Sequence, residues 1–218
     1  MAVAADSFPI RPFSEDEFPG LCDRVAAVDP DLKAIVDGQG YPPFWSRENT
    51  YESLVWFILE QQVSLASAKA ALEKLRARVG TITPENVLGL DHDELRAAYF
   101  SRQKAGYARA LAQEILAGRL DLAALEKLPD ADVRKRLVQL KGIGNWTVDV
   151  YLILTLHRPD VFPAGDLAAV NALKRVKGLP RNTAADELAR VTGQWIPLRT
   201  VATMLLWHDY LSRRTHPR

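Results

Sequence analysis

The sequence predicts an all-α protein, and three observations support this. Alanine and leucine, which favour helices, are abundant; no segment alternates apolar and polar residues as a half-buried strand does; and apolar residues recur at helical spacing between residues 50 and 79. With 218 residues, 48% of them hydrophobic, the chain is long enough for one core or for two small lobes that share one.

Residues 50–79 form the strongest helical pattern. Five side chains fall on one helix face: Leu54, Phe57, Ile58, Gln61 and Leu65. Serine and β-branched residues within segment 61–65 weaken the helix there, so we expect a bend.

The other helices are predicted from capping signals. A short acidic helix is expected over residues 15–28, and further helices are expected to begin at or just after Pro30, Thr83, Asp91, Ser101, Asp130, Asn145, Asp166 and Pro197. We expect the helix from Ser101 to end at Leu116, the helix from Asp130 at Leu140, the helix from Asn145 near Leu156 and the helix after Pro197 near Ser212.

Charge and cysteine content limit the classes of function. The formal net charge is +1, which alone neither favours nor excludes a nucleic-acid partner. Basic clusters within residues 102–109, 134–141 and 174–181 could neutralise phosphates, although each could equally be a solvated helix face. Cys22 is the only cysteine, which excludes an internal disulfide framework, a four-cysteine iron–sulfur cluster and a thiolate zinc site. A reducing cytoplasm is the expected compartment.

Segment 137–147 carries the most specific motif. Gly142 and Gly144 flank Ile143, and a helix begins at once at Asn145. Glycines allow a tight turn and close backbone approach, and the open amides of a helix start lie at the positive end of its dipole. Such a turn can bind a phosphate without reading sequence, with Ile143 packed between the two helices. A plain helical hairpin is the alternative interpretation.

Three segments together resemble the helix-hairpin-helix DNA glycosylase superfamily, and they are most similar to its 3-methyladenine DNA glycosylase II branch. They are residues 58–64 (ILEQQVS), 140–147 (LKGIGNWT) and 161–167 (VFPAGDL). The similarity extends from about residue 20 to the end of the chain. It implies a single catalytic unit of two helical lobes flanking an active-site cleft. One lobe would span approximately residues 50–140, and the other approximately residues 14–49 together with 141–218.

The resemblance implies the roles of individual residues. Asp166 would be the catalytic carboxylate, which stabilises positive charge on the deoxyribose or orients the attacking water; it could also cap its helix, and both roles can hold. Trp146 and Trp207 would line the base pocket, with Tyr151 as a further candidate, because an aromatic face attracts a cationic alkylated base. Core packing remains the alternative for any single aromatic side chain. Asp149 is interpreted as structural.

DNA contacts are implied at the hairpin and at a separate turn. The hairpin residues Lys141, Gly142, Ile143 and Gly144 would contact the DNA backbone. Gln62 would fill the gap that a flipped base leaves in the stack, whereas its alternative role is that of an exposed helical glutamine.

A monovalent cation, Na⁺ or K⁺, is held by hairpin carbonyls in the superfamily. The carbonyls in the same register here are those of Val138, Leu140 and Ile143. No cofactor is expected to be required, and no iron–sulfur cluster is expected.

The chain departs from the family pattern in three ways. Lys141 stands where the hairpin commonly has proline, and its charge should favour phosphate binding. Trp146 stands where bifunctional members have the lysine that forms a Schiff base with the sugar, so no lyase activity is expected. The chain is also shorter than relatives that carry an extra N-terminal β-sheet domain.

These inferences predict a monofunctional DNA N-glycosylase of base excision repair. It would flip alkylated purines of the 3-methyladenine and 7-methylguanine type out of double-stranded DNA and hydrolyse their glycosidic bond. We expect a monomer that has no membrane partner. The alternatives are a glycosylase for another damaged or mispaired base, and a non-catalytic helix-hairpin-helix module that only binds DNA. Missing cluster cysteines disfavour the endonuclease III and adenine-mismatch branches, and the missing hairpin lysine disfavours the bifunctional 8-oxoguanine branch.

Overall fold

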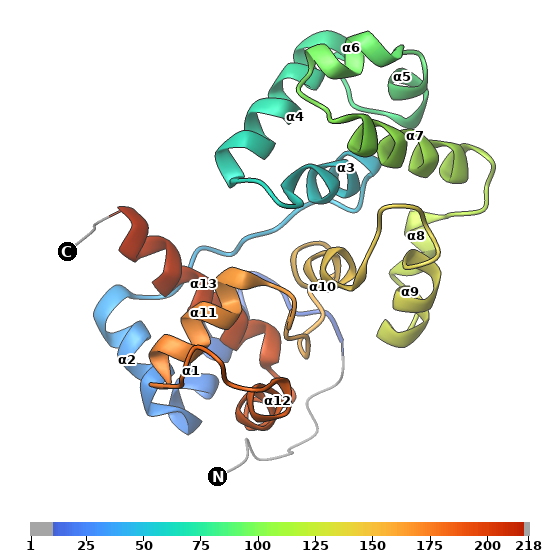
Figure 1. The fold of residues 1–218 in the computed structure, drawn as a ribbon. Helices are drawn as coiled ribbons and strands as arrows, with labels where there is room; N and C mark the ends of the chain where they lie inside the picture. The colour runs from blue at the N-terminus through green and yellow to red at the C-terminus, as the bar shows by residue number, and fades with distance from the viewer. Residues whose placement is uncertain (1–10, 216–218) are drawn as a thin grey trace. The chain divides into compact units, whose positions relative to one another are not determined.

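The computed structural model describes residues 11–215, and these residues fold into α-helices joined by turns and loops (Figure 1). No strand occurs within this range, so the predicted all-α class is confirmed. Over the same range, no helix combines the length and the apolar character needed to cross a membrane.

The chain divides into two compact units. Unit 1 consists of Met1–Ser46 and Leu152–Arg218, and unit 2 consists of Arg47–Tyr151. The boundary near residue 140 that was expected from the sequence lies before the hairpin, whereas this division comes after it.

The helices of unit 1 are α1 (Phe18–Val28), α2 (Pro30–Gln39), α11 (Leu167–Val176), α12 (Ala185–Gly193) and α13 (Arg199–Thr215). Unit 2 contains α3 (Tyr51–Glu60), α4 (Leu65–Val79), α5 (Pro84–Leu88), α6 (His92–Ala97), α7 (Arg102–Leu116), α8 (Leu122–Leu125) and α9 (Asp130–Leu137). Helix α10 (Asn145–Leu154) begins in unit 2 and continues past the division.

Helix α7 is central to unit 2, because it packs against α3, α5 and α6. Helix α3 is apolar on nearly every side, and Leu54, Phe57 and Ile58 are completely buried. The expected bend follows it: α3 ends at Glu60, and Ser64 caps α4 by accepting a hydrogen bond from the Ser67 amide. The intervening turn bears Gln62, the residue expected to fill the gap that a flipped base leaves.

Helix α13 is central to unit 1 and packs against α1, α2 and α11. A buried carboxylate, Asp29, caps α2 and also accepts hydrogen bonds from Lys177 Nζ and Trp195 Nε1, both at 2.6 Å. A buried carboxylate is tolerated only when donors surround it. Asp29 therefore joins the start of α2 to the residue after α11 and to the buried Trp195.

Three features of the fold differ from the sequence-based expectations, the first being that α1 begins at Phe18 rather than at residue 15. Helix α9 ends at Leu137 rather than Leu140, because residues 138–140 tighten into a turn in which the Leu140 amide bonds to the Leu137 carbonyl. Helices α8 and α12 were not expected. The N-cap of α12 is Ala184, which offers no side-chain cap, although two acids in its first turn were a usable signal.

Candidate active site and DNA-binding hairpin

Asp166 is the N-cap of α11 in unit 1. Its Oδ1 atom accepts two hydrogen bonds, one from the Ala169 amide at 2.8 Å and one from Trp207 Nε1 at 3.0 Å. The side chain is half-buried. The structure thus gives Asp166 the expected capping role and also an indole donor that orients the carboxylate.

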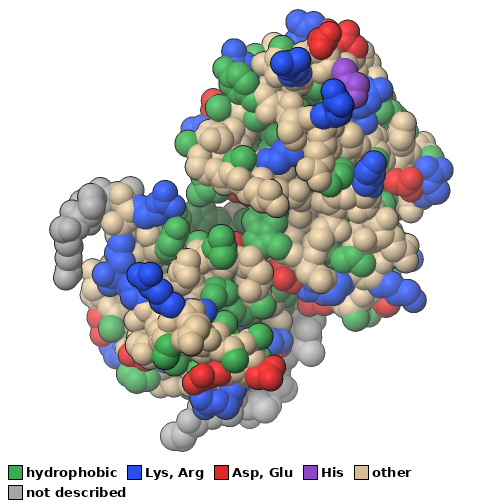
Figure 2. Space-filling view, viewed as in Figure 1, with side chains coloured by type: hydrophobic (Ala, Val, Ile, Leu, Met, Phe, Trp, Pro, Cys, Tyr) green, Lys and Arg blue, Asp and Glu red, His purple; other side chains and the backbone are tan. Residues whose placement is uncertain are grey.

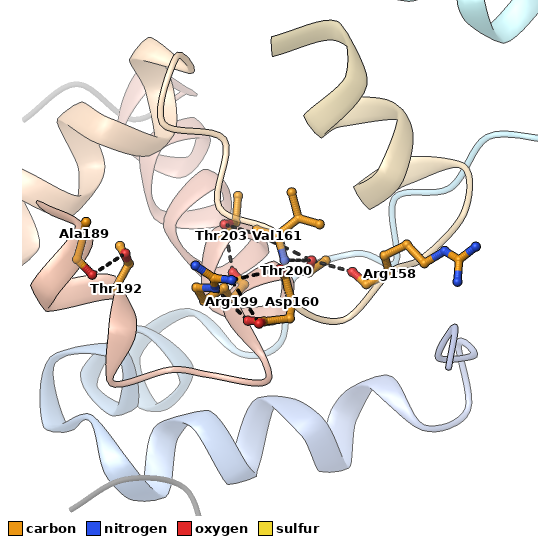
Figure 3. A network of polar contacts seen from close by, with 8 residues as sticks. All are labelled: Arg158, Asp160, Val161, Ala189, Thr192, Arg199, Thr200 and Thr203. Atoms are coloured by element: carbon orange, nitrogen blue, oxygen red, sulfur yellow. Dashed lines mark hydrogen bonds and ion pairs between the residues drawn. The ribbon is translucent and has the colours of Figure 1, made fainter. Parts of the chain in front are cut away.

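The segment before Asp166 is fastened to the start of α13 (Figure 3). The Arg199 guanidinium donates to both oxygens of Asp160, with Nε to Oδ1 at 2.7 Å and a terminal nitrogen to Oδ2 at 2.9 Å. The Thr200 hydroxyl donates to the Arg158 carbonyl at 2.5 Å and accepts from the Val161 amide at 3.1 Å. Arg199 and Thr200 of α13 therefore hold the beginning of the segment. Trp207 of the same helix holds the Asp166 carboxylate, which lies at the end of the segment.

Two further side chains of unit 1 lie beside this carboxylate or its indole partner. The Trp45 ring meets the Trp207 ring edge-on, with centroids 6.4 Å apart, and both rings are half-buried. Leu167, directly after Asp166, is 78% exposed. Sequence reasoning missed Trp45 because it lies two residues after Gly40-Tyr41-Pro42-Pro43, a stretch that the sequence indicates only as a break between helices. The two adjacent aromatic residues that follow this break, Phe44 and Trp45, were the available signal.

The hairpin of unit 2 lies between α9 and α10. Ile143 is 4% exposed, as expected of a residue packed between the two helices. Gly142 has φ +88°, and a Cβ at this position would lie 2.1 Å from the Tyr107 ring. A Cβ at Gly144 would meet nothing within 4 Å, and Gly144 is exposed. Gly142 is therefore required by packing, whereas Gly144 leaves the start of α10 open.

The two hairpin helices are joined by an arginine. Arg134 on α9 donates to Asn145 Oδ1 at 3.2 Å and forms an ion pair with Asp149 on α10. Burial raises the pKa of the Asp149 carboxyl, and the bond from Arg134 opposes that shift. This pairing agrees with the structural role assigned to Asp149.

A groove of about 610 Å³ adjoins the hairpin and is lined partly by Arg119, Arg136 and Lys141. Arg119 is already paired with Glu114, whereas Arg136 and Lys141 are exposed. On the face drawn in Figure 2, Lys and Arg side chains are scattered among acidic and uncharged ones. The groove thus places the exposed cations Arg136 and Lys141 beside the hairpin.

The remaining predicted residues have varied surroundings. Trp146 is half-buried in the first turn of α10, and Gln62 is exposed with a left-handed φ of +59°. Tyr151, the further candidate for the base pocket, is completely buried, and its hydroxyl donates to Asn49 Oδ1 at 2.7 Å. Core packing, the alternative role for a single aromatic side chain, agrees with this burial.

Comparison with known proteins identifies the family. The family model described as HhH-GPD superfamily base excision DNA repair protein matches residues 55–198. The chain belongs to this superfamily. The match includes the hairpin and Asp166, which are the features that the sequence resemblance emphasised.

Relatives of this HhH-GPD protein place it on the predicted branch. YfjP of Bacillus subtilis is 31% identical over 82% of this chain, which spans 65% of the length of YfjP. DNA-3-methyladenine glycosylase 1 of Schizosaccharomyces pombe is 30% identical over 84% of each chain. The structure of 3-methyladenine DNA glycosylase Mag1 from S. pombe in complex with abasic DNA has a TM-score of 0.80 and 29% identity, and covers 86% of this chain and 95% of its own. The predicted membership of the 3-methyladenine branch is confirmed.

Proposed function

We propose that this protein is a monofunctional DNA N-glycosylase that removes alkylated purines, of the 3-methyladenine and 7-methylguanine type, in base excision repair. The observation that carries the proposal is the carboxylate of Asp166, which two N–H donors hold on one oxygen at the start of α11. The names of the S. pombe relatives support the substrate class.

Asp166 acts on the sugar in this proposal. When the C1′–N bond breaks, its electron pair leaves with the base, which loses the positive charge that alkylation gave it. Positive charge then develops on the deoxyribose, and a fixed carboxylate stabilises it. The oxygen of a water molecule forms the new bond to C1′ and gives up a proton. No strong general acid is needed, because the cationic purine is already a good leaving group.

Double-stranded DNA containing a damaged base is the proposed substrate, and the protein is proposed to act as a monomer. In the hairpin, the first helical bond runs from the Val148 amide to the Gly144 carbonyl, so the amides before Val148 lie in the open first turn of α10. These amides, with Lys141 beside them, suit a phosphate. The exposed Gln62 suits the gap left by a flipped base.

Lyase activity is not part of the proposed reaction. Trp146 occupies the hairpin position where a Schiff-base lysine would stand, so no amine is placed there to attack the sugar. Borohydride should therefore trap no covalent complex between the protein and DNA containing an abasic site. A trapped complex would make the enzyme bifunctional.

A monovalent cation at the hairpin is a secondary proposal. The carbonyl of Leu140 accepts a hydrogen bond from the Ile143 amide at 3.1 Å and keeps a second lone pair for an ion. With the carbonyls of Val138 and Ile143, it would hold Na⁺ or K⁺, whose charge would attract a DNA phosphate.

The test is to incubate the protein with methylated duplex DNA and to identify released bases by mass spectrometry. Free 3-methyladenine or 7-methylguanine is the expected product, and affinity for duplex DNA should fall steeply with salt because phosphate contacts dominate. Salt-sensitive DNA binding without base release would favour the binding module. Release of another damaged base alone would favour the other glycosylase alternative.

A further inference from the structure

Gln61 connects the turn that bears Gln62 to the hairpin of unit 2. Its Nε2 atom donates to the Gly142 carbonyl at 2.8 Å and to the Thr147 hydroxyl at 3.1 Å. A backbone carbonyl can only accept, so the amide nitrogen must be the atom that faces it. One side chain therefore contacts both the glycine turn and the first turn of α10.

Two residues of α7 support the same connection. The Tyr107 ring fills the position that a Cβ of Gly142 would occupy, so the turn rests against it. Lys104 Nζ donates to the Leu59 carbonyl at 2.7 Å and so holds the last turn of α3. Helix α7 thus backs the hairpin and the end of α3, while Gln61 joins them directly.

The residue after Gln61 has a conformation that needs such support. Gln62 is exposed and has a φ of +59°, a left-handed conformation that non-glycine residues seldom adopt. Such a conformation persists only where its surroundings impose it. The two hydrogen bonds of the Gln61 side chain hold in place the residue immediately before Gln62.

We propose that Gln61 is a positioning residue that sets the separation between Gln62 and the phosphate-binding hairpin. This inference rests on the proposed function, because the two elements must engage one duplex together. A side chain that enters the base stack is effective only when the adjacent backbone is gripped at the matching distance. Fixing that distance in the free protein removes the cost of ordering it on binding.

The test compares Gln61→Leu with Gln113→Leu, the same substitution at an exposed glutamine of α7. The probe is a duplex with an abasic-site analogue and 2-aminopurine next to it, whose emission rises when the base unstacks. Thermal stability and affinity for undamaged duplex are measured in parallel. Gln61→Leu should lower the emission gained at saturation by about tenfold, while affinity for undamaged duplex changes less than about threefold. Gln113→Leu should match the wild type.

A second variant, Gln61→Glu, keeps the proposal testable if Gln61→Leu folds poorly. Its ionised carboxylate would face the Gly142 carbonyl and repel it, whereas the protonated acid can donate one hydrogen bond. The emission gain should therefore recover partly as pH falls, relative to the wild type at the same pH. A merely structural role would instead lower stability and affinity together without this pH-dependent recovery.

These readouts separate the two proposals, because unstacking requires no bond cleavage. A wild type that unstacks the probe but releases no base would overturn the glycosylase proposal and leave this one intact. A Gln61→Leu protein with full emission at saturation would overturn the positioning role, whatever its affinity.

Discussion

The hairpin and the Asp166 segment present their functional groups in different ways. The hairpin offers backbone amides, and packing fixes their direction: Ile143 is buried and the Tyr107 ring lies against Gly142. Asp166 offers a side chain that can rotate, and directional bonds from Ala169 and Trp207 hold it. The difference predicts that added bulk should damage the hairpin, whereas loss of a donor should damage the carboxylate site.

The largest expected effect comes from the carboxylate itself. Asp166→Asn keeps the shape and the capping oxygen but removes the charge, so base release from methylated DNA should fall at least about 100-fold. Affinity for DNA should stay similar or rise, because a negative charge is lost. Asp121→Asn, at the N-cap of α8, is the matched control and should keep full activity. Turnover within a few fold of the wild type would reject the proposed role.

The hairpin should be most sensitive at Gly142. Gly142→Ala places a methyl group 2.1 Å from the Tyr107 ring at a φ of +88°, so unfolding free energy should fall by roughly 3 kcal/mol. Gly144→Ala meets no atom within 4 Å and should unfold like the wild type while binding DNA more weakly. Adding Tyr107→Ala to Gly142→Ala should restore part of the loss. Equal stability of the two alanine variants in urea would contradict this interpretation.

Removing one hydrogen-bond donor from the Asp166 carboxylate should lower activity less than removing its charge. Trp207→Phe keeps an aromatic ring but loses the bond to Asp166 Oδ1, so kcat for base release should fall by about tenfold with little change in KM. Trp45→Phe keeps that bond and an edge-on ring, and should change kcat less. A larger loss in Trp45→Phe would show that ring contact matters more than the hydrogen bond.

The smallest expected effect is on pH-dependent stability near the Asp166 segment. His157 lies against Phe13 and Phe44, its Nε2 atom is buried without a hydrogen-bond partner among the described residues, and burial lowers its pKa. The unfolded chain then binds a proton more readily than the folded one, so stability should fall as pH drops below about 6.5. His157→Asn, which tolerates the φ of +47°, should flatten the loss between pH 7 and 5 in thermal melts. An unchanged slope would exclude this histidine as the cause.

The sequence by itself determined the helical class, most helix starts and the location of the hairpin turn and of the Asp166 cap. Capping residues and glycines act on their immediate neighbours, so Ser101, Asp166 and the Gly142 turn could be interpreted locally. No strong local signal marks the end of α9, whereas α8 and α12 were missed although Asp121 caps the first and two acids lie in the first turn of the second.

Only the tertiary structure decided which side chains serve these segments. Trp207 is 41 residues from the carboxylate it contacts, and Gln61 is 81 residues from the carbonyl it binds. Tyr151, a pocket candidate in sequence, is completely buried, and its hydroxyl is bonded to Asn49. Contacts between residues distant in sequence depend on how whole helices pack, and local sequence patterns do not specify that packing.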